Sequence, residues 1–246
     1  MTAINAVTEL EIDGEIATVR IDSPPVNALS ANVRDGIKRG LEAAEANGAV
    51  KAIVLICAGR TFIAGADISE FGKPPRPPTL PDVLDAIENA SKPVVAAIHG
   101  TALGGGFEVA LTAHYRIAVP SAKMGLPEIK LGLIPGAGGT QRLTRLCGRS
   151  VASRLILGAE IVDGADAVRL GIAQWAVARA ELPTRAGEIA RRIAGLPAPA
   201  LRASKKCIAA AEEPGDRGYL GELAETRRLS TDAETRERVA AFLAGH

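Results

Sequence analysis

The sequence has few aromatic residues, few cysteines and no excess of charge of either sign. Phe, Trp and Tyr make up 3% of the 246 residues, so Ala, Val, Ile and Leu must fill the core, which favours layered helices and sheet. The 29 basic and 28 acidic side chains give a net charge of +1, so no basic surface for a nucleic-acid partner is expected. The cysteines Cys57, Cys147 and Cys207 are odd in number and lack paired metal spacing, which indicates a reducing compartment and no metal site.

Long apolar runs and several common motifs are also missing. No apolar run reaches the ~18 residues of a membrane span, and the N-terminus lacks the features of a signal peptide, so we expect a cytoplasmic protein without a membrane partner. The chain has no phosphate loop, no Gly-x-Gly-x-x-Gly fingerprint, no Gly-x-Ser-x-Gly elbow and no His-Glu-x-x-His. These absences argue against the commonest nucleotide, serine-hydrolase and zinc chemistries.

Strand-like and helix-like segments alternate through the first half of the chain. Residues 7–12 and 16–21 alternate apolar and polar side chains around Asp13-Gly14, which predicts a β-hairpin. Ser30 is placed to cap a helix that runs to about Asn47, and the wholly apolar run 52–57 is typical of a strand covered on both faces. Further segments of this kind are helices at 79–90 and 103–112 and strands at 93–98 and 115–119. This order predicts a layered α/β domain.

Helices dominate after about residue 138. The expected helices are 138–147, 149–158, 163–170, 183–195, 198–212, 216–229 and 231–244. The last two carry many charges and few apolar positions, so they either face solvent or meet another subunit. In the first half of the chain, five prolines within residues 72–81 remove backbone donors and predict an irregular surface loop near the site.

Glu108 and Glu128 are the strongest functional signal, because each lies in a glycine-rich frame and two acids can run acid and base chemistry on one substrate. Glycines 104–106 open the expected helix before Glu108, where helix N–H groups lack partners and a ligand can approach the backbone. Two alternatives stay open. The glycine run could be only a tight strand-to-helix turn packed against a neighbour, and Glu108 could be a solvated helix residue. Glu128 lies among apolar residues, where burial and a neighbouring like charge would raise its pKa.

The run Ala64-Gly65-Ala66-Asp67 has the same character as the glycine run. Its small side chains precede an acid, Asp67, that could cap a following helix. Two separated N–H donors aimed at one carbonyl oxygen would form an oxyanion hole.

Three segments, 62–68, 102–108 and 125–142, closely resemble the enoyl-CoA hydratase/isomerase (crotonase) superfamily, and the resemblance runs over nearly the whole chain. It implies an α/β fold, the crotonase (ClpP-like) spiral of ββα units, with a catalytic core at 1–190 and a helical oligomerisation region at 191–246 that builds trimers. It also implies an acyl-CoA thioester as substrate and a homotrimer or a hexamer, a dimer of trimers. No cofactor is implied, since coenzyme A is part of the substrate.

The resemblance also assigns residues. It matches the N–H groups of Ala66 and Gly105 to the oxyanion hole for the thioester carbonyl, and Glu108 and Glu128 to the two hydratase acids. The other substrate-binding positions are Ala64 and Ile68 beside the adenine of CoA, Asp67 between them, and Gly136 as a backbone contact near the reacting water.

The presence of both acids favours a hydratase that converts trans-2-enoyl-CoA to 3-hydroxyacyl-CoA. The alternatives are a Δ3-Δ2 enoyl-CoA isomerase, which chiefly needs Glu128, and a non-catalytic scaffold subunit of the same fold. Residues 112–118 resemble the hydratase module of bifunctional hydratase/3-hydroxyacyl-CoA dehydrogenases more than they resemble stand-alone hydratases.

Overall fold

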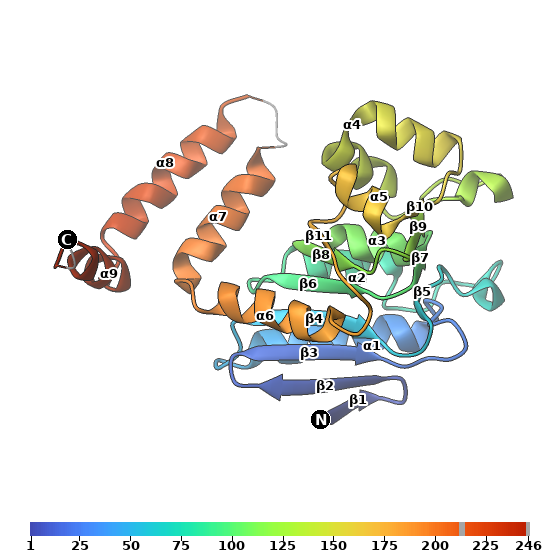
Figure 1. The fold of residues 1–246 in the computed structure, drawn as a ribbon, viewed down its shortest axis with the longest axis horizontal. Coiled ribbons are helices and arrows are strands. Elements are labelled where there is room, and N and C mark those ends of the chain that lie inside the picture. The colour runs from blue at the N-terminus through green and yellow to red at the C-terminus, as the bar shows by residue number, and fades with distance from the viewer. Residues whose placement is uncertain (212–214, 245–246) are drawn as a thin grey trace. The chain divides into compact units, whose positions relative to one another are not determined.

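Strands of two sheets alternate with helices along the first 191 residues (Figure 1). The computed structural model describes residues 1–211 and 215–244, and the chain divides into two units, Met1–Arg191 and a second that begins at Arg192. The larger sheet has the order β1-β2-β3-β4-β6-β8-β11, antiparallel across β1, β2 and β3 and parallel from β3 onward. Its strands are β1 (Thr2–Asn5), β2 (Thr8–Asp13), β3 (Ile16–Ile21), β4 (Ala52–Cys57), β6 (Val94–Ile98), β8 (Tyr115–Ala118) and β11 (Trp175–Ala176).

A second sheet of short strands lies beside one end of the first (Figure 1). Its order is β10-β9-β7-β5, and the strands are β5 (Thr61–Ile63), β7 (Thr101–Leu103), β9 (Lys123–Gly125) and β10 (Val162–Asp163). Each turn of the chain adds one strand to each sheet and then a helical segment: β4-β5-α2, β6-β7-α3 and β8-β9-α4. This repetition is the spiral of ββα units that the resemblance implied.

The helices of the first unit pack in chain order, α1 on α2, α2 on α3 and α3 on α4. Their bounds are α1 (Ala31–Ala46), α2 (Leu80–Glu88), α3 (Gly105–Thr112), α4 (Gly139–Leu157), α5 (Gly164–Arg169) and α6 (Leu182–Ala194), with short 3-10 helices η1 (Ile68–Glu70) and η2 (Glu128–Leu131). Ser30 caps α1 as expected, through a hydrogen bond from Val33 N. The expected break between 147 and 149 is real, because Gly148 is non-helical inside α4.

The core lies between the large sheet and these helices. Strands β4 and β6 are buried along their whole length, as their apolar runs predicted. The hairpin is also confirmed, since β2 pairs antiparallel with β3 from Thr8↔Ile21 to Asp13↔Ile16. On α1, Val33, Ile37 and Leu41 face inward at helical spacing.

Two sequence expectations need correction. The helix expected from residue 103 begins at Gly105, because Thr101–Leu103 forms β7. The irregular loop expected over 72–81 ends earlier, because α2 begins at Leu80. Thr79 caps that helix, and Pro81 lies in its first turn, where the missing N–H is not needed. Strands of two or three residues, such as β5 and β10, carry too few positions for a periodic pattern and were not predicted.

The second unit consists of helices α7 (Ala198–Ala210), α8 (Arg217–Ser230) and α9 (Ala233–Ala244), after the end of α6. Residue 212, the end of the expected 198–212 helix, lies outside the described residues. In the part of the chain that the structure describes, no helix combines the length and apolar character needed to cross a membrane.

Candidate active site

The backbone N–H groups of Ala66 and Gly105 lie next to each other although 39 positions separate them in the sequence. A Cβ built on Gly105 would be only 3.8 Å from Ala66 N. Ala66 follows β5, and Gly105 is the first residue of α3, where the N–H has no intrahelical partner. Among the described residues, neither N–H has a hydrogen-bond acceptor. Two backbone donors without an acceptor among the described residues therefore lie close together, as an oxyanion hole requires.

A glycine in the left-handed region precedes each donor. Gly65 has φ +127° and Gly104 has φ +53°, conformations that L side chains rarely adopt. Both glycines are tied into the fold, since Leu29 N donates to Gly65 O at 2.9 Å and Gly104 N donates to Gly125 O at 3.0 Å. These bonds fix the glycines and leave the next N–H in each segment unpaired.

Glu108 lies one turn into α3 and is only 2% exposed. Its Oε1 accepts two hydrogen bonds, from Ala137 N at 2.9 Å and from Gly139 N at 2.8 Å. Gly139 is the first residue of α4, so the carboxylate also lies at the positive end of that helix. Both partners are backbone N–H donors, and together they fix the position of this carboxylate oxygen.

Glu128 has the opposite environment. It opens η2, and a Cβ built on Gly104 would lie 3.2 Å from its Oε1, so the side chain lies against the turn that leads into α3. Its Oε2 is buried and has no hydrogen-bond partner among the described residues. Burial, and secondarily the charge on Glu108, raise the pKa of Glu128, which are the two causes expected from the sequence. The structure thus places one carboxylate with two hydrogen-bond donors beside another whose buried oxygen has none among the described residues.

The remaining predicted positions surround these groups. Asp67 caps η1 by accepting a hydrogen bond from Ser69 N at 2.9 Å, so its predicted capping role is confirmed. The side chain of Ile68 is 82% exposed, and Ala64 is held by its N–H to Val26 O at 3.2 Å. Gly136 is exposed and directly precedes Ala137, the donor to Glu108.

The proline-rich loop lies beside Ala66. A cavity of about 300 Å³ is lined by Ala66, Phe71 and Leu80 together with this loop. Arg34, on α1, holds the loop by donating to the carbonyls of Arg76 at 2.8 Å and Pro78 at 2.7 Å.

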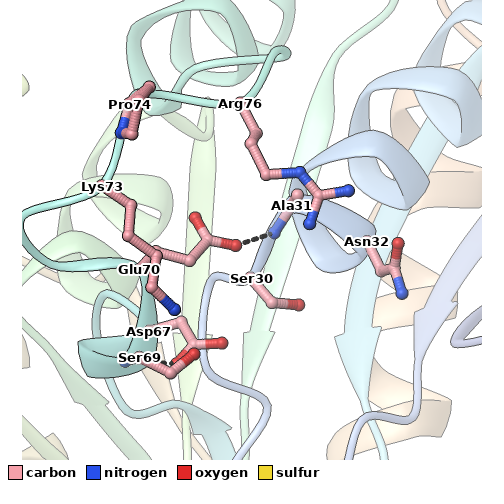
Figure 2. A pocket seen from close by; sticks show the side chains of 9 residues that line it. All are labelled: Ser30, Ala31, Asn32, Asp67, Ser69, Glu70, Lys73, Pro74 and Arg76. Carbon is pink, nitrogen blue, oxygen red and sulfur yellow. Dashed lines mark hydrogen bonds between the residues drawn. The ribbon is translucent and has the colours of Figure 1, made fainter.

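Arg34 also forms an ion pair with Glu70 at 2.9 Å. The other oxygen of Glu70 accepts from Ala31 N at the start of α1, as Figure 2 shows. Burial opposes ionisation of Glu70, but the bonds from Ala31 and Arg34 outweigh it, and the pKa is lowered. Glu70 thus occupies the N-terminus of α1. It lines a second cavity of about 240 Å³, the one drawn in Figure 2, together with Lys73 and Arg76.

Sequence reasoning missed the two donors that hold Glu108. The signal was present in Pro135-Gly136-Ala137-Gly138-Gly139, a small-residue run before a helix, but only Gly136 was selected from it. No group of three or more His, Cys, Asp or Glu within residues 1–211 and 215–244 is arranged to hold a metal ion.

Known proteins share both the sequence and the fold. The family model for enoyl-CoA hydratase/isomerase matches residues 11–243. A peroxisomal bifunctional enzyme of Danio rerio is 50% identical over 157 residues, which cover 64% of this chain and 22% of that protein. A probable enoyl-CoA hydratase of Bacillus subtilis (strain 168) is 42% identical over 176 residues, covering 69% of this chain and 68% of that protein.

Among solved structures, an enoyl-CoA hydratase subunit I from Geobacillus kaustophilus HTA426 superposes with a TM-score of 0.91 at 34% identity, covering 98% of this chain and 96% of that one. The predicted fold class is confirmed by this match. The chain spans less than a quarter of the length of the Danio rerio relative.

Proposed function

This chain belongs to the enoyl-CoA hydratase/isomerase family, and from that premise we propose that it adds water to a trans-2-enoyl-CoA to give a 3-hydroxyacyl-CoA. The observation that carries the proposal is the contrast between the two acids. Glu108 accepts two backbone hydrogen bonds, whereas Glu128 has a buried oxygen without a partner and a raised pKa. Two carboxyl groups in different surroundings can take different roles, so that one removes a proton and the other supplies one.

The thioester carbonyl oxygen would bind between the N–H groups of Ala66 and Gly105. Negative charge develops on this oxygen when a nucleophile attacks the conjugated β-carbon, and the two donors are in place before the reaction begins. Loss of one such donor typically costs ~10²–10³ in rate.

Glu108 would act as the general base. Its Oε1 is occupied by the N–H groups of Ala137 and Gly139, so Oε2 takes a proton from a water molecule. The water oxygen forms a bond to the β-carbon, and the electrons of the double bond move through the α-carbon to the thioester oxygen. Gly136, next to Ala137, would contact this water through its backbone.

Glu128 would act as the general acid. It delivers its proton to the α-carbon as the enolate collapses and the thioester carbonyl re-forms. One proton then passes from Glu108 to Glu128 through solvent, which restores both acids for the next turnover. Because the two groups interact, their titration belongs to the pair.

The test replaces each acid with its amide. The side chain introduced by Glu108→Gln retains an oxygen that can accept from Ala137 and Gly139, so this substitution removes the base with little change in packing. We expect Glu108→Gln and Glu128→Gln each to lower kcat by ~10²–10⁴, followed by the loss of ultraviolet absorbance of the conjugated thioester. Glu160→Gln is the control, since Glu160 is exposed and forms an ion pair with Arg154. Undiminished hydration by both active-site variants would sink the mechanism.

The same variants separate hydration from Δ3-Δ2 isomerisation. An isomerase needs the oxyanion hole and chiefly Glu128. If Glu108→Gln isomerises a 3-enoyl-CoA as fast as the unmodified protein, and the unmodified protein does not hydrate, the isomerase alternative holds. A scaffold subunit would turn over neither substrate.

Binding and assembly complete the proposal. Ala64, Asp67 and Ile68 would contact the CoA part of the substrate, and no separate cofactor is needed. The chain would form homotrimers or hexamers through the region that begins near residue 191. In support, exposed apolar side chains lie on α8 and α9: Tyr219, Leu220, Leu223, Val239, Phe242 and Leu243. Light scattering on the purified protein checks the assembly, and a cytoplasmic location stays a prediction.

A further inference from the structure

The peptide groups around Ala137 are held from both sides. The N–H of Ala137 donates to Glu108 Oε1 at 2.9 Å, and its carbonyl oxygen accepts from Arg142 Nη1 at 2.8 Å. Arg142 lies in the first turn of α4, one turn after the other donor to Glu108, Gly139. The guanidinium of Arg142 therefore fixes Ala137, which in turn donates to Glu108, the proposed base.

Arg142 is itself fixed by a bidentate ion pair with Glu88. Its Nε donates to Glu88 Oε1 at 3.0 Å and its Nη2 donates to Glu88 Oε2 at 2.5 Å. Glu88 is the last residue of α2, so this pair joins the end of α2 to the start of α4. Such fork geometry orients the guanidinium far better than a single contact does.

The fit between Arg142 and the loop is tight. A Cβ at Gly138 would overlap Arg142 Nη1, and Gly138 has φ +93°, so glycine is needed there for two reasons. The Arg142 side chain is only 15% exposed, whereas that of its partner Glu88 is 45% exposed. The hydrogen bond to Glu88 is the largest cause that raises the pKa of Arg142, and the charges of Glu88 and Glu108 add to it.

We propose that Arg142, anchored by Glu88, is a positioning residue for Glu108: it holds the peptide groups at Ala137 so that Glu108 meets the attacking water with its free oxygen. This role rests on the proposed hydration. A merely structural ion pair would link α2 to α4 and contribute to stability alone. A positioning pair changes the chemical step, because a displacement of ~1 Å in the reacting groups can cost ~10²-fold in rate.

The experiment compares Arg142→Gln, Arg142→Lys and Glu88→Gln with the control Arg154→Gln. Arg154 lies on the same helix α4 and pairs with Glu160 at 2.7 Å, but both side chains are largely exposed. Three measurements are made on each purified variant: kcat and KM for an enoyl-CoA, the melting temperature, and amide hydrogen exchange of the segment 135–142 by mass spectrometry.

We expect Arg142→Gln to lower kcat by ~10-fold or more while KM stays within about twofold. The segment 135–142 exchanges faster, because Arg142 no longer holds the carbonyl oxygen of Ala137. Arg142→Lys, which keeps the charge but not the fork, falls between Arg142→Gln and the unmodified protein, as does Glu88→Gln. Arg154→Gln changes none of these.

Two results overturn the proposal. The first is an Arg142→Gln enzyme with kcat within twofold of the unmodified protein. The second is a loss of kcat that follows a lower melting temperature, with the exchange of 135–142 unchanged. If the unmodified protein hydrates no enoyl-CoA, the proposed function fails, but the exchange measurement still decides whether Arg142 holds this segment.

Discussion

Replacing Gly139 with alanine tests whether the exact placement of Glu108 matters. A Cβ at residue 139 would lie 3.0 Å from Glu108 Oε1, and also 3.0 Å from Leu126 Cδ1 and Pro135 Cβ. Ordinary contacts are about 3.5–4.0 Å, so the new methyl lacks roughly 0.5 Å on three sides. It cannot relieve one contact without tightening another, and Glu108 must move.

The stability effect of Gly139→Ala is small because two terms oppose each other. Overpacking by one methyl group costs ~1–3 kcal/mol, whereas alanine in place of glycine favours a helix by up to ~1 kcal/mol. The net loss is ~0–3 kcal/mol, which lowers the melting temperature by no more than about 12 °C for a chain of this size. The expected effect on kcat is larger than this small loss of stability would suggest. If ~1 Å costs ~10²-fold, a shift of ~0.5 Å costs ~10-fold in kcat.

The assay is a double-mutant cycle with Glu108→Gln, measured by hydration of an enoyl-CoA. If the methyl acts by moving Glu108, Gly139→Ala should cost ~10-fold in the unmodified protein and far less when Glu108 is already replaced. Gly48→Ala is the control, because a Cβ there would meet no atom within 4 Å. An equal loss in both backgrounds would falsify the reasoning, since the effect would then act through another group.

Two further predictions concern stability. Burial, and next the charge of Glu108, raise the pKa of Glu128. The contribution of Glu128 to the free energy of unfolding is therefore fully present below its ordinary pKa of 4.5 and is lost as pH rises through its raised pKa in the folded protein. Glu128→Gln should therefore be more stable than the unmodified protein in urea at pH 7, with a gain that shrinks towards pH 4; a pH-independent gain contradicts this. Arg34→Met should cost ~3–5 kcal/mol, because it leaves Glu70 and two loop carbonyls without their donor. Its exposed counterpart Arg39→Met, which loses only a 3.4 Å pair with Asp35, should cost ~0–1 kcal/mol, and equal melting temperatures would refute the difference.

The two glutamates differ in the backbone groups that surround them. Glu108 sits at the N-terminus of α4 with two N–H donors, and a helix N-terminus favours a negative charge. Glu128 sits in a short 3-10 helix, and no donor reaches its buried oxygen among the described residues. Two identical side chains thus lie in different surroundings, and those of Glu128 raise its pKa, chiefly through burial.

Much of the fold could be predicted because its longer elements carry local patterns. The hairpin of β2 and β3 follows from alternation around Asp13-Gly14, and α1 follows from Ser30 and the spacing of its apolar residues. The short strands could not be predicted in this way. Strands β5 and β10 have three and two residues, and they form only because neighbouring turns of the spiral supply partners.

The amino-acid sequence by itself determined which groups were available for chemistry. Side-chain type and backbone conformation are local properties. Local sequence therefore identifies Glu108 and Glu128, and also the glycines at positions whose positive φ other residues rarely adopt. The resemblance of the sequence to its family then indicated Ala66 and Gly105 as the candidate backbone donors.

Tertiary structure alone decided how these groups act on one another. The meeting of Ala66 with Gly105, and the bonds from Ala137 and Gly139 to Glu108, join segments that are about 30 to 40 residues apart. Whether a carboxylate holds or releases its proton depends on burial and on the donors around it. Those surroundings exist only once the turns of the spiral have stacked, so the difference between the two acids is a property of the fold.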